Sequence, residues 1–555
     1  MRISRLFDRV ATFTVTEGSE LSSIGETLSA RQRALLVGAL NFHALDTPGT
    51  SLDVNVYVAA RGFGSSLTDV ATRSKPKHHP TWIGEFTIVS TAEGELHQHF
   101  RPKGKQFMPE ADSGERHIVL DTDPGADEDA SLIRHGLYWG IRMAVERRYP
   151  FAYDRVRQRL IRGREASLYT TRIARSNHNP EVSPLAEPNH NAAAVLFGLH
   201  WLDLGGAERW ALKTIQVATE HGLVPVVITD VASPHPWITH PELADAVVIP
   251  LTHPIGQPEY SEPLLDAIVR NWDVRGIYVH HCRWLYDRLP WLRRRVPRTP
   301  VVDSQHILEY NGGGYPAFGV LLDESIDTHH VISPQLEEWL RDVQGVAPEK
   351  IVLAPLIGLT MDTTRVTAVR ARVNPDSFNV GFVGRFAHQK RPHLFLKLVE
   401  ELRRSLGMPV RAVIQGSGVL ESFVQREIER HNLRDVVILR GERAPVEETL
   451  EMTDMLVISS QNEGIALTAL EAIALGVPVL SADVGSQRTI VPSDALIPRD
   501  PDEFVRSAAD VVKRAAHNEE FRAELWAREA ELAEAFSELE SADSWVERKF
   551  TEWSK

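Results

Sequence analysis

The chain has 555 residues, of which 43% are hydrophobic and 25% are charged, a composition typical of a globular protein with about three domains. Its formal net charge of −14 argues against nonspecific binding to nucleic acid, because the phosphate backbone favours a basic surface. Cys282 is the only cysteine, which excludes an intrachain disulfide and favours a reducing cytoplasm.

The N-terminus and the hydropathy along the chain bear on localisation. The first nine residues are charged and have no apolar core, which is not typical of a secretory signal peptide. No apolar run approaches the roughly 18 residues that a membrane-spanning helix needs. We therefore expect a soluble, cytoplasmic protein, with a peripheral contact at the inner face of the membrane as the alternative.

Residues 1–176 differ in character from the rest of the chain and predict an accessory α+β domain of unknown role. Residues 53–58 alternate in polarity like a half-buried strand, and residues 86–90 and 95–100 flank a turn as in a hairpin. The stretch from 130 to about 174 has a helical pattern and is rich in arginine.

An acidic segment interrupts this first region. Residues 120–129 resemble the calcium-binding segment of nucleoside hydrolases, and Asp121 and Asp123 match a metal-binding Asp-x-Asp pair. The region lacks the long α/β chain that such a hydrolase needs around its motif. We therefore favour a solvated acidic turn before a helix, where the helix dipole stabilises carboxylates, and we predict no metal site.

A linker and a first α/β lobe follow. Three prolines and several polar residues mark residues 177–191 as the linker. Residues 192–375 then alternate between strands and helices, which predicts a Rossmann-like lobe. The expected strands are 194–199, 224–228, 246–249, 276–279, 300–303 and 329–332, and a helix is expected at 207–220.

Glycines and histidines stand at the strand ends of this lobe. Gly205 and Gly206 lie between the first strand and its helix, where the backbone can approach a ligand, although tight turns need glycine too. His280 and His281 follow the strand at 276–279, and His306 follows that at 300–303. Each imidazole can hydrogen-bond a sugar hydroxyl or a phosphate, and a structural role is equally compatible with its position.

Arg293, Arg294, Arg295 and Arg298 form a local basic cluster near two tryptophans. We favour a solvated helix face for this cluster over an acceptor-binding or membrane-touching surface.

A second Rossmann-like lobe is expected at 376–535, and a C-terminal helix at 536–555. The expected strands are 379–383, 410–415, 436–439 and 456–459. Arg385 and Lys390 follow the first of these strands and Gly416 the second, so they lie at the carboxyl edge of the sheet. Two cations there can neutralise a diphosphate and stabilise charge on a leaving group. The predicted fold class is therefore α/β, with two Rossmann-like lobes and an additional N-terminal α+β domain.

The most informative stretch is 461–480. A buried strand precedes it, Glu463 lies in a loop at the carboxyl end of that strand, and a helix follows that contains Glu471 and ends at Gly476. The helix points its first N–H groups at the same crevice, which suits a phosphate. Glu471 lies about two helical turns after Glu463, so both carboxylates can face one elongated ligand. A nucleotide-sugar, with phosphate at the amides and ribose at a carboxylate, fits this pattern.

Together with Arg385, Lys390 and the stretch 205–209, the segment 463–478 resembles the retaining glycosyltransferases of family 4. The resemblance covers about residues 192–535. It implies the two-lobed glycosyltransferase-B fold, a UDP- or GDP-sugar donor held mainly by the C-terminal lobe, an acceptor on the N-terminal lobe, and neither a metal nor another cofactor.

The resemblance also implies roles for residues. Glu471 is expected to bind the ribose, Glu463 the transferred sugar, and Arg385 and Lys390 the diphosphate, while His280 or His281 contacts the sugar. The implied donor-binding set is Gly205, Gly206, Arg385, Lys390, Gly416, Glu463, Gly464, Ile465, Ala466, Leu467 and Glu471, and the implied catalytic set is Glu463, His280, His281, Arg385 and Lys390. The chain departs from the family at Ala466, where glycine is common, and at residues 355–358, where Asn-Gly-Val-Asp is common.

These implications predict a retaining glycosyltransferase that moves a sugar from a nucleotide-sugar to a glycan, lipid or protein acceptor. A sugar-nucleotide epimerase or a phosphorylase on the same scaffold is the alternative enzyme. A non-catalytic nucleotide- or glycan-binding protein is the alternative from another class. The presence of Glu463, Glu471, Arg385 and Lys390 together disfavours it.

Overall fold

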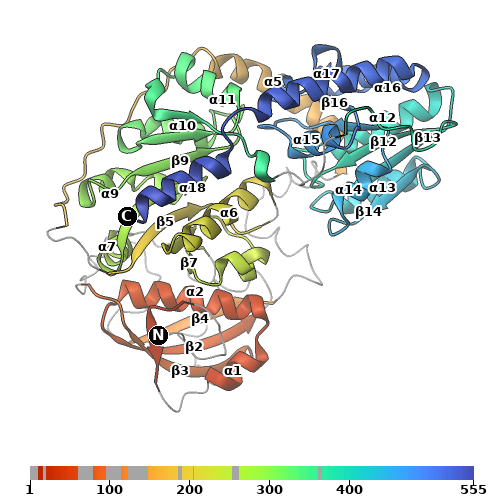
Figure 1. Ribbon diagram of the computed structural model, residues 1–555. Coiled ribbons are helices and arrows are strands. Elements are labelled where there is room, and N and C mark those ends of the chain that lie inside the picture. The colour runs from red at the N-terminus through yellow and green to blue at the C-terminus, as the bar shows by residue number, and fades with distance from the viewer. Residues whose placement is uncertain are drawn as a thin grey trace.

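The computed structural model describes residues 10–16, 21–59, 79–94, 114–122, 148–185, 191–203, 205–252, 262–359 and 366–555. Within these ranges the chain forms three β-sheets, one in an N-terminal region and one in each of two lobes (Figure 1).

The first lobe is built on a parallel sheet, whose described strands are ordered β11-β10-β9-β8-β5-β6-β7. The strands are β5 Ala193–Leu199, β6 Val224–Thr229, β7 Val247–Pro250, β8 Asp273–His280, β9 Val301–Gln305, β10 Thr328–Val331 and β11 Ile351–Leu353. Its helices are α6 Gly206–Glu220, α7 Glu262–Asn271, α8 Arg283–Tyr286, α9 Leu289–Arg295, α10 Tyr315–Leu321 and α11 Pro334–Glu338.

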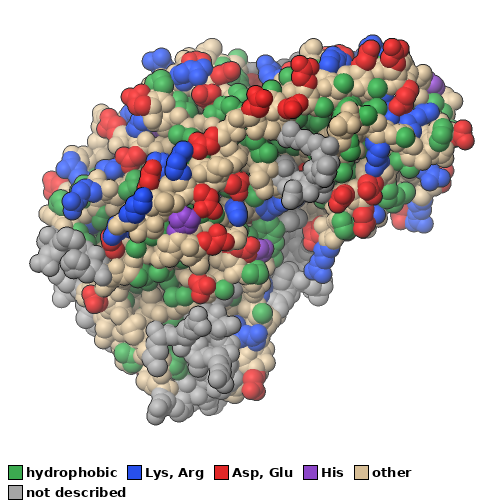
Figure 2. All heavy atoms as spheres, in the orientation of Figure 1, with side chains coloured by type: hydrophobic (Ala, Val, Ile, Leu, Met, Phe, Trp, Pro, Cys, Tyr) green, Lys and Arg blue, Asp and Glu red, His purple; other side chains and the backbone are tan. Residues whose placement is uncertain are grey.

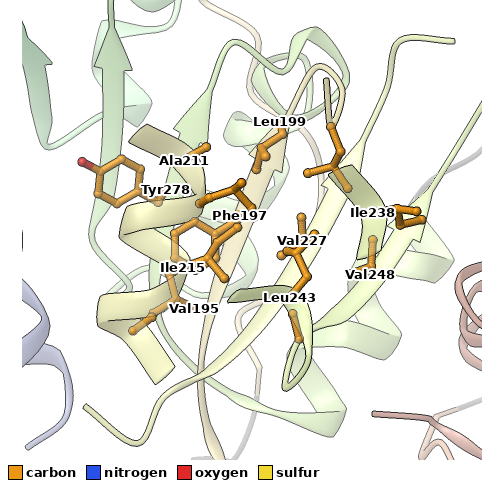
Figure 3. Packing of buried hydrophobic residues seen from close by; sticks show 14 of the residues in the cluster. Val195, Phe197, Leu199, Ala211, Ile215, Val227, Ile238, Leu243, Val248 and Tyr278 are labelled. Carbon is orange, nitrogen blue, oxygen red and sulfur yellow. The ribbon is translucent and has the colours of Figure 1, made fainter. Parts of the chain in front are cut away.

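Strand β5 explains why this sheet is covered on both faces. Its apolar residues belong alternately to two buried clusters, because successive side chains of a strand point to opposite faces. Figure 3 shows one of these clusters around β5, α6 and β6, with Val195, Phe197, Leu199, Ala211, Ile215, Val227 and Tyr278 among its members. The predicted strands at 194–199 and 224–228 are confirmed.

The second lobe repeats the arrangement. Its described strands are ordered β14-β13-β12-β15-β16-β17, all parallel. They are β12 Phe378–Val383, β13 Val410–Gln415, β14 Val437–Arg440, β15 Met455–Ile458, β16 Val479–Ala482 and β17 Leu496–Ile497. The helices are α12 Pro392–Ser405, α13 Glu421–Arg430, α14 Val446–Glu451, α15 Leu467–Ala474, α16 Pro501–His517 and α17 Glu519–Ser537.

Each lobe has a point at which the strand order reverses. It lies between β5 and β8 in the first lobe and between β12 and β15 in the second. Open α/β sheets bind ligands at the carboxyl ends of the strands at such switch points. The loops that follow these four strands contain most of the residues that the sequence nominated.

The last helix, α18 (Ala542–Trp553), returns from the second lobe and packs on the first, as Figure 1 shows beside α6. Its Trp553 lies so close to β8 that a Cβ at Gly276 would be 2.3 Å from the indole ring. Gly358, in the segment between the lobes, faces Asp543 at the start of the same helix. The C-terminal helix therefore covers the first lobe and contacts the connection between the lobes.

The N-terminal region contains the strands β1 Phe13–Val15, β2 Ser51–Ala59, β3 Trp82–Ser90 and β4 Glu115–Asp121, ordered β1-β3-β2-β4. The pairs of β3 with β1 and β2 are antiparallel, and β2 pairs with β4 in parallel. Because β1 and β2 occupy both edges of β3, the hairpin expected with residues 95–100 is not formed by the described strands, and those residues lie outside the described ranges.

Helix α2 (Ala30–Asp46), which follows α1 (Leu21–Thr27), joins this small sheet to the first lobe. It is buried along most of its length, and the polar side chains of Arg31, Gln32 and Asn41 are buried with the apolar ones. At Gly38 a Cβ would lie 2.6 Å from Cδ of Pro250 in β7, so glycine allows the close approach of helix and strand.

The helix expected within 130–174 is α5 (Pro150–Leu168), and among the described elements it does not pack with the N-terminal sheet. It packs against α12 and α16 of the second lobe, and Figure 1 shows it at the top of the molecule between the lobes. The described parts of residues 1–176 thus lie in two places, and the domain boundaries taken from the sequence stay a prediction. The fold class, two Rossmann-like lobes with an N-terminal α+β region, is confirmed.

Two surface features complete the fold. None of the described helices has both the length and the apolar composition that crossing a membrane requires. In the basic cluster, Arg293 pairs with Asp327 at 2.6 Å and Arg295 with Asp266 at 2.7 Å. Arg293 and Arg295 are thus held in ion pairs with limited exposure, whereas Arg294 and Arg298 are exposed, so only part of the cluster is the solvated face that the sequence predicted. Figure 2 shows acidic and basic side chains interspersed over both lobes.

Candidate functional site

The two switch points face each other across the junction of the lobes. A Cβ at Gly206, at the start of α6, would lie 3.9 Å from Cδ1 of Leu467, at the start of α15. Asn462 Nδ2 donates to the carbonyl of Leu308 at 2.9 Å, and a Cβ at Gly464 would lie 2.1 Å from the carbonyl oxygen of His306. The N-termini of two helices, one from each lobe, therefore point into a common space.

Lys390 and Glu463 form the polar centre of the second lobe. Lys390 Nζ donates to Oε1 of Glu463 at 2.6 Å, and the hydroxyl of Ser460 donates to the same oxygen at 2.5 Å. Gln389 accepts from the N–H of Gln461 at 2.7 Å. These contacts connect the loops after β12 and β15, so the cation and the carboxylate that the sequence placed at one sheet edge do meet.

Arg385 lies half-buried in the loop after β12, between Gly384 and Phe386. The N–H of Phe386 donates to the carbonyl of Ser417 at 2.6 Å, which draws this loop against the one after β13. A Cβ at Gly416 would lie 2.1 Å from the carbonyl oxygen of Gly384, and its φ is 150°. The glycine at 416 is therefore required by the protein backbone itself, and contact with a donor remains a prediction.

Helix α15 begins at a cap that offers no acceptor. Ala466 is the N-cap, with φ −74° and ψ 111°, and among the described residues no side chain accepts a hydrogen bond at this end. Gly464 and Ile465 precede it in the loop. The first amides of α15 are thus directed at the space between the lobes, and an anion there would satisfy them.

Glu471 lies in the second turn of α15 and is buried, with 5% of its surface exposed. Burial raises the pKa of its carboxyl group, and the charge of Arg209, which belongs to α6 of the first lobe, opposes the rise. The charge of Arg209 therefore acts on Glu471 across the junction of the lobes.

Gly205 and Gly206 have different surroundings. A Cβ at Gly205 would lie 1.9 Å from Oε2 of Glu208, whereas Gly206 is exposed and faces α15. Glu208 accepts from Trp201 Nε1 at 2.5 Å and lies 2.9 Å from His200 Nε2. Burial would raise the pKa of Glu208, but these hydrogen bonds and the charge of His200 lower it to about 2. Glu208 therefore remains ionised beside the cleft.

Sequence reasoning missed the pairing of His200 with Glu208. Glu208 lies within the stretch 205–209 that carries the family resemblance, but no role was predicted for it. His200 comes directly after β5, at the same edge of the sheet as His280, the last residue of β8. Because His200 and His280 both lie at carboxyl ends of neighbouring strands, this position could have identified His200 as a residue of the site.

Three histidines of the first lobe lie together at the ends of β8 and β9. The rings of His281 and His306 are 4.8 Å apart, and those of His280 and His306 are 6.1 Å apart. His281 has φ 57° and stacks on Tyr315 at 4.7 Å. His280 Nε2 lies 3.0 Å from the hydroxyl of Thr214.

Burial sets the charge of this cluster. It lowers the pKa of His281 to about 3 and those of His280 and His306 well below the ordinary value, so all three are neutral at pH 7. His281 Nε2, His280 Nδ1 and His306 Nδ1 have no hydrogen-bond partner among the described residues. Neutral imidazoles can donate or accept, which suits hydroxyl groups of a sugar.

The acidic segment at 120–129 is partly described. Asp121 ends β4 and pairs with Arg31 of α2 at 3.0 Å, while Asp123 lies outside the described residues. Within the described ranges, no group of three or more His, Cys, Asp and Glu side chains is arranged to hold a metal ion. The described part of the segment thus serves as an ion-pair partner in the N-terminal sheet.

A cavity of about 220 Å³ lies away from the cleft, between α5, α12 and α13. Lys397, Glu400, Glu427 and His431 line it and pair with one another, so its charges are already matched. The geometry of the strand ends, rather than this cavity, indicates where a ligand binds.

Comparison with known proteins agrees with this geometry. The family model described as "Glycosyl transferases group 1" matches residues 368–527. A similar curated protein is the D-inositol 3-phosphate glycosyltransferase of Kineococcus radiotolerans, which is 28% identical over 327 residues that cover 52% of this chain and 74% of that protein.

Two solved structures are similar to this chain at low identity. HepE of Anabaena, in complex with UDP and glucose, has a TM-score of 0.49 and 16% identity, covering 65% of this chain and 98% of that chain. The pneumococcal O-GlcNAc transferase GtfA, in complex with UDP and GlcNAc, has a TM-score of 0.41 and 19% identity, and the match covers 50% of this chain and 56% of that chain.

Proposed function

Because the chain is a glycosyltransferase of the two-lobed glycosyltransferase-B type, we propose that it transfers a sugar from a UDP- or GDP-sugar to a hydroxyl of a glycan, lipid or protein acceptor, with retention at the anomeric carbon. The contact between Lys390 and Glu463 beside the uncapped N-terminus of α15 is the observation that supports this proposal.

In this proposal the diphosphate lies at the first amides of α15, between Lys390 and Arg385. The bond from the anomeric carbon to the diphosphate oxygen breaks, and negative charge develops on that oxygen. Preorganised cations and amide dipoles stabilise such charge without a reorganisation cost. The acceptor oxygen bonds to the anomeric carbon from the same side, and its proton leaves with the diphosphate.

The carboxylates have separate roles. Glu471, in the second turn of α15, accepts hydrogen bonds from the ribose hydroxyls. Glu463 is anchored by Lys390 and Ser460 and binds hydroxyls of the transferred sugar. An anchored carboxylate suits orientation of the sugar better than nucleophilic attack, because attack would require it to leave both partners.

The first lobe supplies the acceptor side. Gly206 leaves room beside the phosphates at the facing helix N-terminus, and His280 or His281 contacts the sugar. We place the reaction in the cytoplasm, a proposal that rests on the chain having a single cysteine, Cys282, which is buried. The printed names of the relatives favour transfer over epimerisation, phosphorolysis or binding alone.

The test is a calorimetric titration with UDP, GDP and ADP, followed by hydrolysis and transfer assays with the matching sugar-nucleotides. We expect one nucleoside diphosphate to bind, and a ligand at 100 times its Kd to add about 2.7 kcal/mol of stability. Transfer should continue in excess EDTA, because Arg385, Lys390 and the helix amides take the place of a metal. If activity disappears on chelation and returns with Mn²⁺, the metal-independent mechanism is wrong.

A further inference from the structure

Arg391 follows Lys390 directly and has an unusual conformation for an arginine. Its φ is 54°, in the left-handed region that favours glycine, and its side chain is fully buried. The guanidinium makes specific contacts: Nη1 donates to the carbonyl of Arg499 at 2.9 Å, and Nη2 donates to Oδ1 of Asp154 at 2.9 Å. We conclude that side-chain contacts hold this strained residue in place.

Asp154 comes from α5, 237 positions earlier in the chain. It is itself buried, with 4% of its surface exposed, and its Oδ2 lies 2.8 Å from Arg391 Nε and 3.3 Å from His393 Nε2. Burial would raise the pKa of Asp154, but His393 and Arg391 lower it. A buried guanidinium needs an anion beside it, and among the described residues the carboxylate of Asp154 is the ion-pair partner of Arg391.

The turn that contains Arg391 also determines where Lys390 lies. The N–H groups of both residues donate to the carbonyl of Ala387, each at 3.1 Å. The hydroxyl of Ser459 lies 2.9 Å from the carbonyl oxygen of Lys390 and 3.1 Å from that of Arg391. A displacement of Arg391 therefore moves the backbone of Lys390, whose ammonium group contacts Glu463.

We propose that Asp154 is a positioning residue of the transfer reaction. By holding Arg391, the carboxylate of α5 fixes Lys390 at the diphosphate and, through Lys390, Glu463 at the transferred sugar. The N-terminal region thus contributes to the donor site without contacting the donor. The proposal rests on the function proposed above for Lys390 and Glu463.

The experiment compares Asp154→Asn with the matched control Asp502→Asn in the full-length chain. Asp502 also forms an ion pair with α5, through Arg155 at 2.5 Å, but that pair is exposed and lies on α16. Arg391→Gly and the double variant complete a cycle. Glycine tolerates the positive φ and brings no charge, so Arg391→Gly tests the same tether even if Asp154→Asn does not fold.

Two measurements are made at a temperature at which circular dichroism shows each variant folded. Hydrogen–deuterium exchange of the nucleotide-free protein should rise at least tenfold in residues 385–391 and 459–463 for Asp154→Asn and Arg391→Gly, but not for Asp502→Asn. The affinity for UDP or GDP should fall about tenfold relative to that for UMP or GMP. The double variant should be no worse than either single one, because both changes break one tether.

Other results would overturn the proposal. If exchange rises over the whole second lobe and the diphosphate and monophosphate affinities fall in equal proportion, Asp154 has only a structural role. If the two single effects multiply in the double variant, Asp154 does not act through Arg391. If wild-type protein binds neither UDP nor GDP, the proposed donor is wrong, while the exchange measurement still decides whether Asp154 positions the turn.

Discussion

Replacing Glu471 by glutamine is expected to stabilise the nucleotide-free protein and to weaken its binding of nucleotide. Glu471 is buried in α15, and burial raises the pKa of its carboxyl group from the ordinary 4.5. A carboxyl group with a raised pKa stabilises the folded state below its ordinary pKa and loses that contribution as the pH rises through the folded value. At pH 7 the wild-type protein therefore buries a charged carboxylate, which lowers its free energy of unfolding. Glutamine has a side chain of the same size but no charge, so the variant avoids this loss of stability.

The two effects have estimable sizes. Each unit of the pKa rise corresponds to about 1.4 kcal/mol, and 1 kcal/mol shifts the melting temperature of a lobe of this size by about 2–4 °C. For binding, a hydrogen bond to a charged group contributes about 1 kcal/mol more than a neutral one. If Glu471 accepts from two ribose hydroxyls, Glu471→Gln loses about 2 kcal/mol, or roughly 30-fold in Kd.

The assay combines thermal melting with calorimetry between pH 5 and 8. Wild-type affinity should fall at the acid end as Glu471 is protonated, and the Glu471→Gln variant should lack this component, while titration of the nucleotide's own phosphate affects both equally. Glu447→Gln, an exposed glutamate in the first turn of α14, is the control. A Glu471→Gln variant that melts lower than wild type, yet binds nucleotide equally well, would refute the reasoning.

Two further changes test parts of the site, and a third tests the buried Glu529 of α17. Lys390→Met should lower kcat/KM by about 10² to 10³, as for loss of one oxyanion-stabilising donor, while UMP or GMP still binds. If kcat/KM and the affinity for UMP or GMP fell by the same factor, Lys390 would not lie at the diphosphate. His281→Asn, which tolerates the positive φ, should lower transfer without changing nucleotide affinity, and a changed affinity would move His281 to the donor side. Glu529→Gln should raise the melting temperature at pH 7 to 8 and leave the activity unchanged. Burial raises the pKa of Glu529 well above its ordinary range, so the wild-type protein loses stability as the pH rises, and glutamine removes this loss.

Local patterns predicted the elements that place the site. Apolar runs such as β5 and β15 are buried on both faces, so composition alone marks them as parallel strands. The polar residues that interrupt the pattern directly afterwards, among them Lys390 and Glu463, then fall at the carboxyl ends. The edge strands β11 and β17 escaped prediction because three and two residues leave no periodic signal.

The glycines were harder to interpret from the sequence. Gly205 and Gly416 were nominated for the donor because small residues let a ligand approach. In the structure, a Cβ at these positions would meet the carboxylate of Glu208 and the carbonyl of Gly384, respectively. A sequence shows that a side chain is missing, but only the fold shows which neighbour requires its absence.

Helix α5 could not be placed from the sequence because its amphipathic pattern is inverted. Asp154 and Gln158 are buried, while Val156 and Leu160 are 60% and 67% exposed. Asp154 and Gln158, four residues apart and buried, together with the partly exposed Glu165, bind the guanidinium groups of Arg391 and Arg499.

A hydrophobic pattern locates a helix because any apolar core will accept it, whereas a face of carboxylates and amides fits only a matching set of buried cations. Here the matching cation, Arg391, is strained, follows Lys390 and shares its turn. The contacts between Asp154 and Arg391 therefore stabilise both the packing of α5 on the second lobe and the position of Lys390. For this reason we treat α5 and the second lobe as one structural unit, although 209 residues separate the end of α5 at Leu168 from the start of β12 at Phe378.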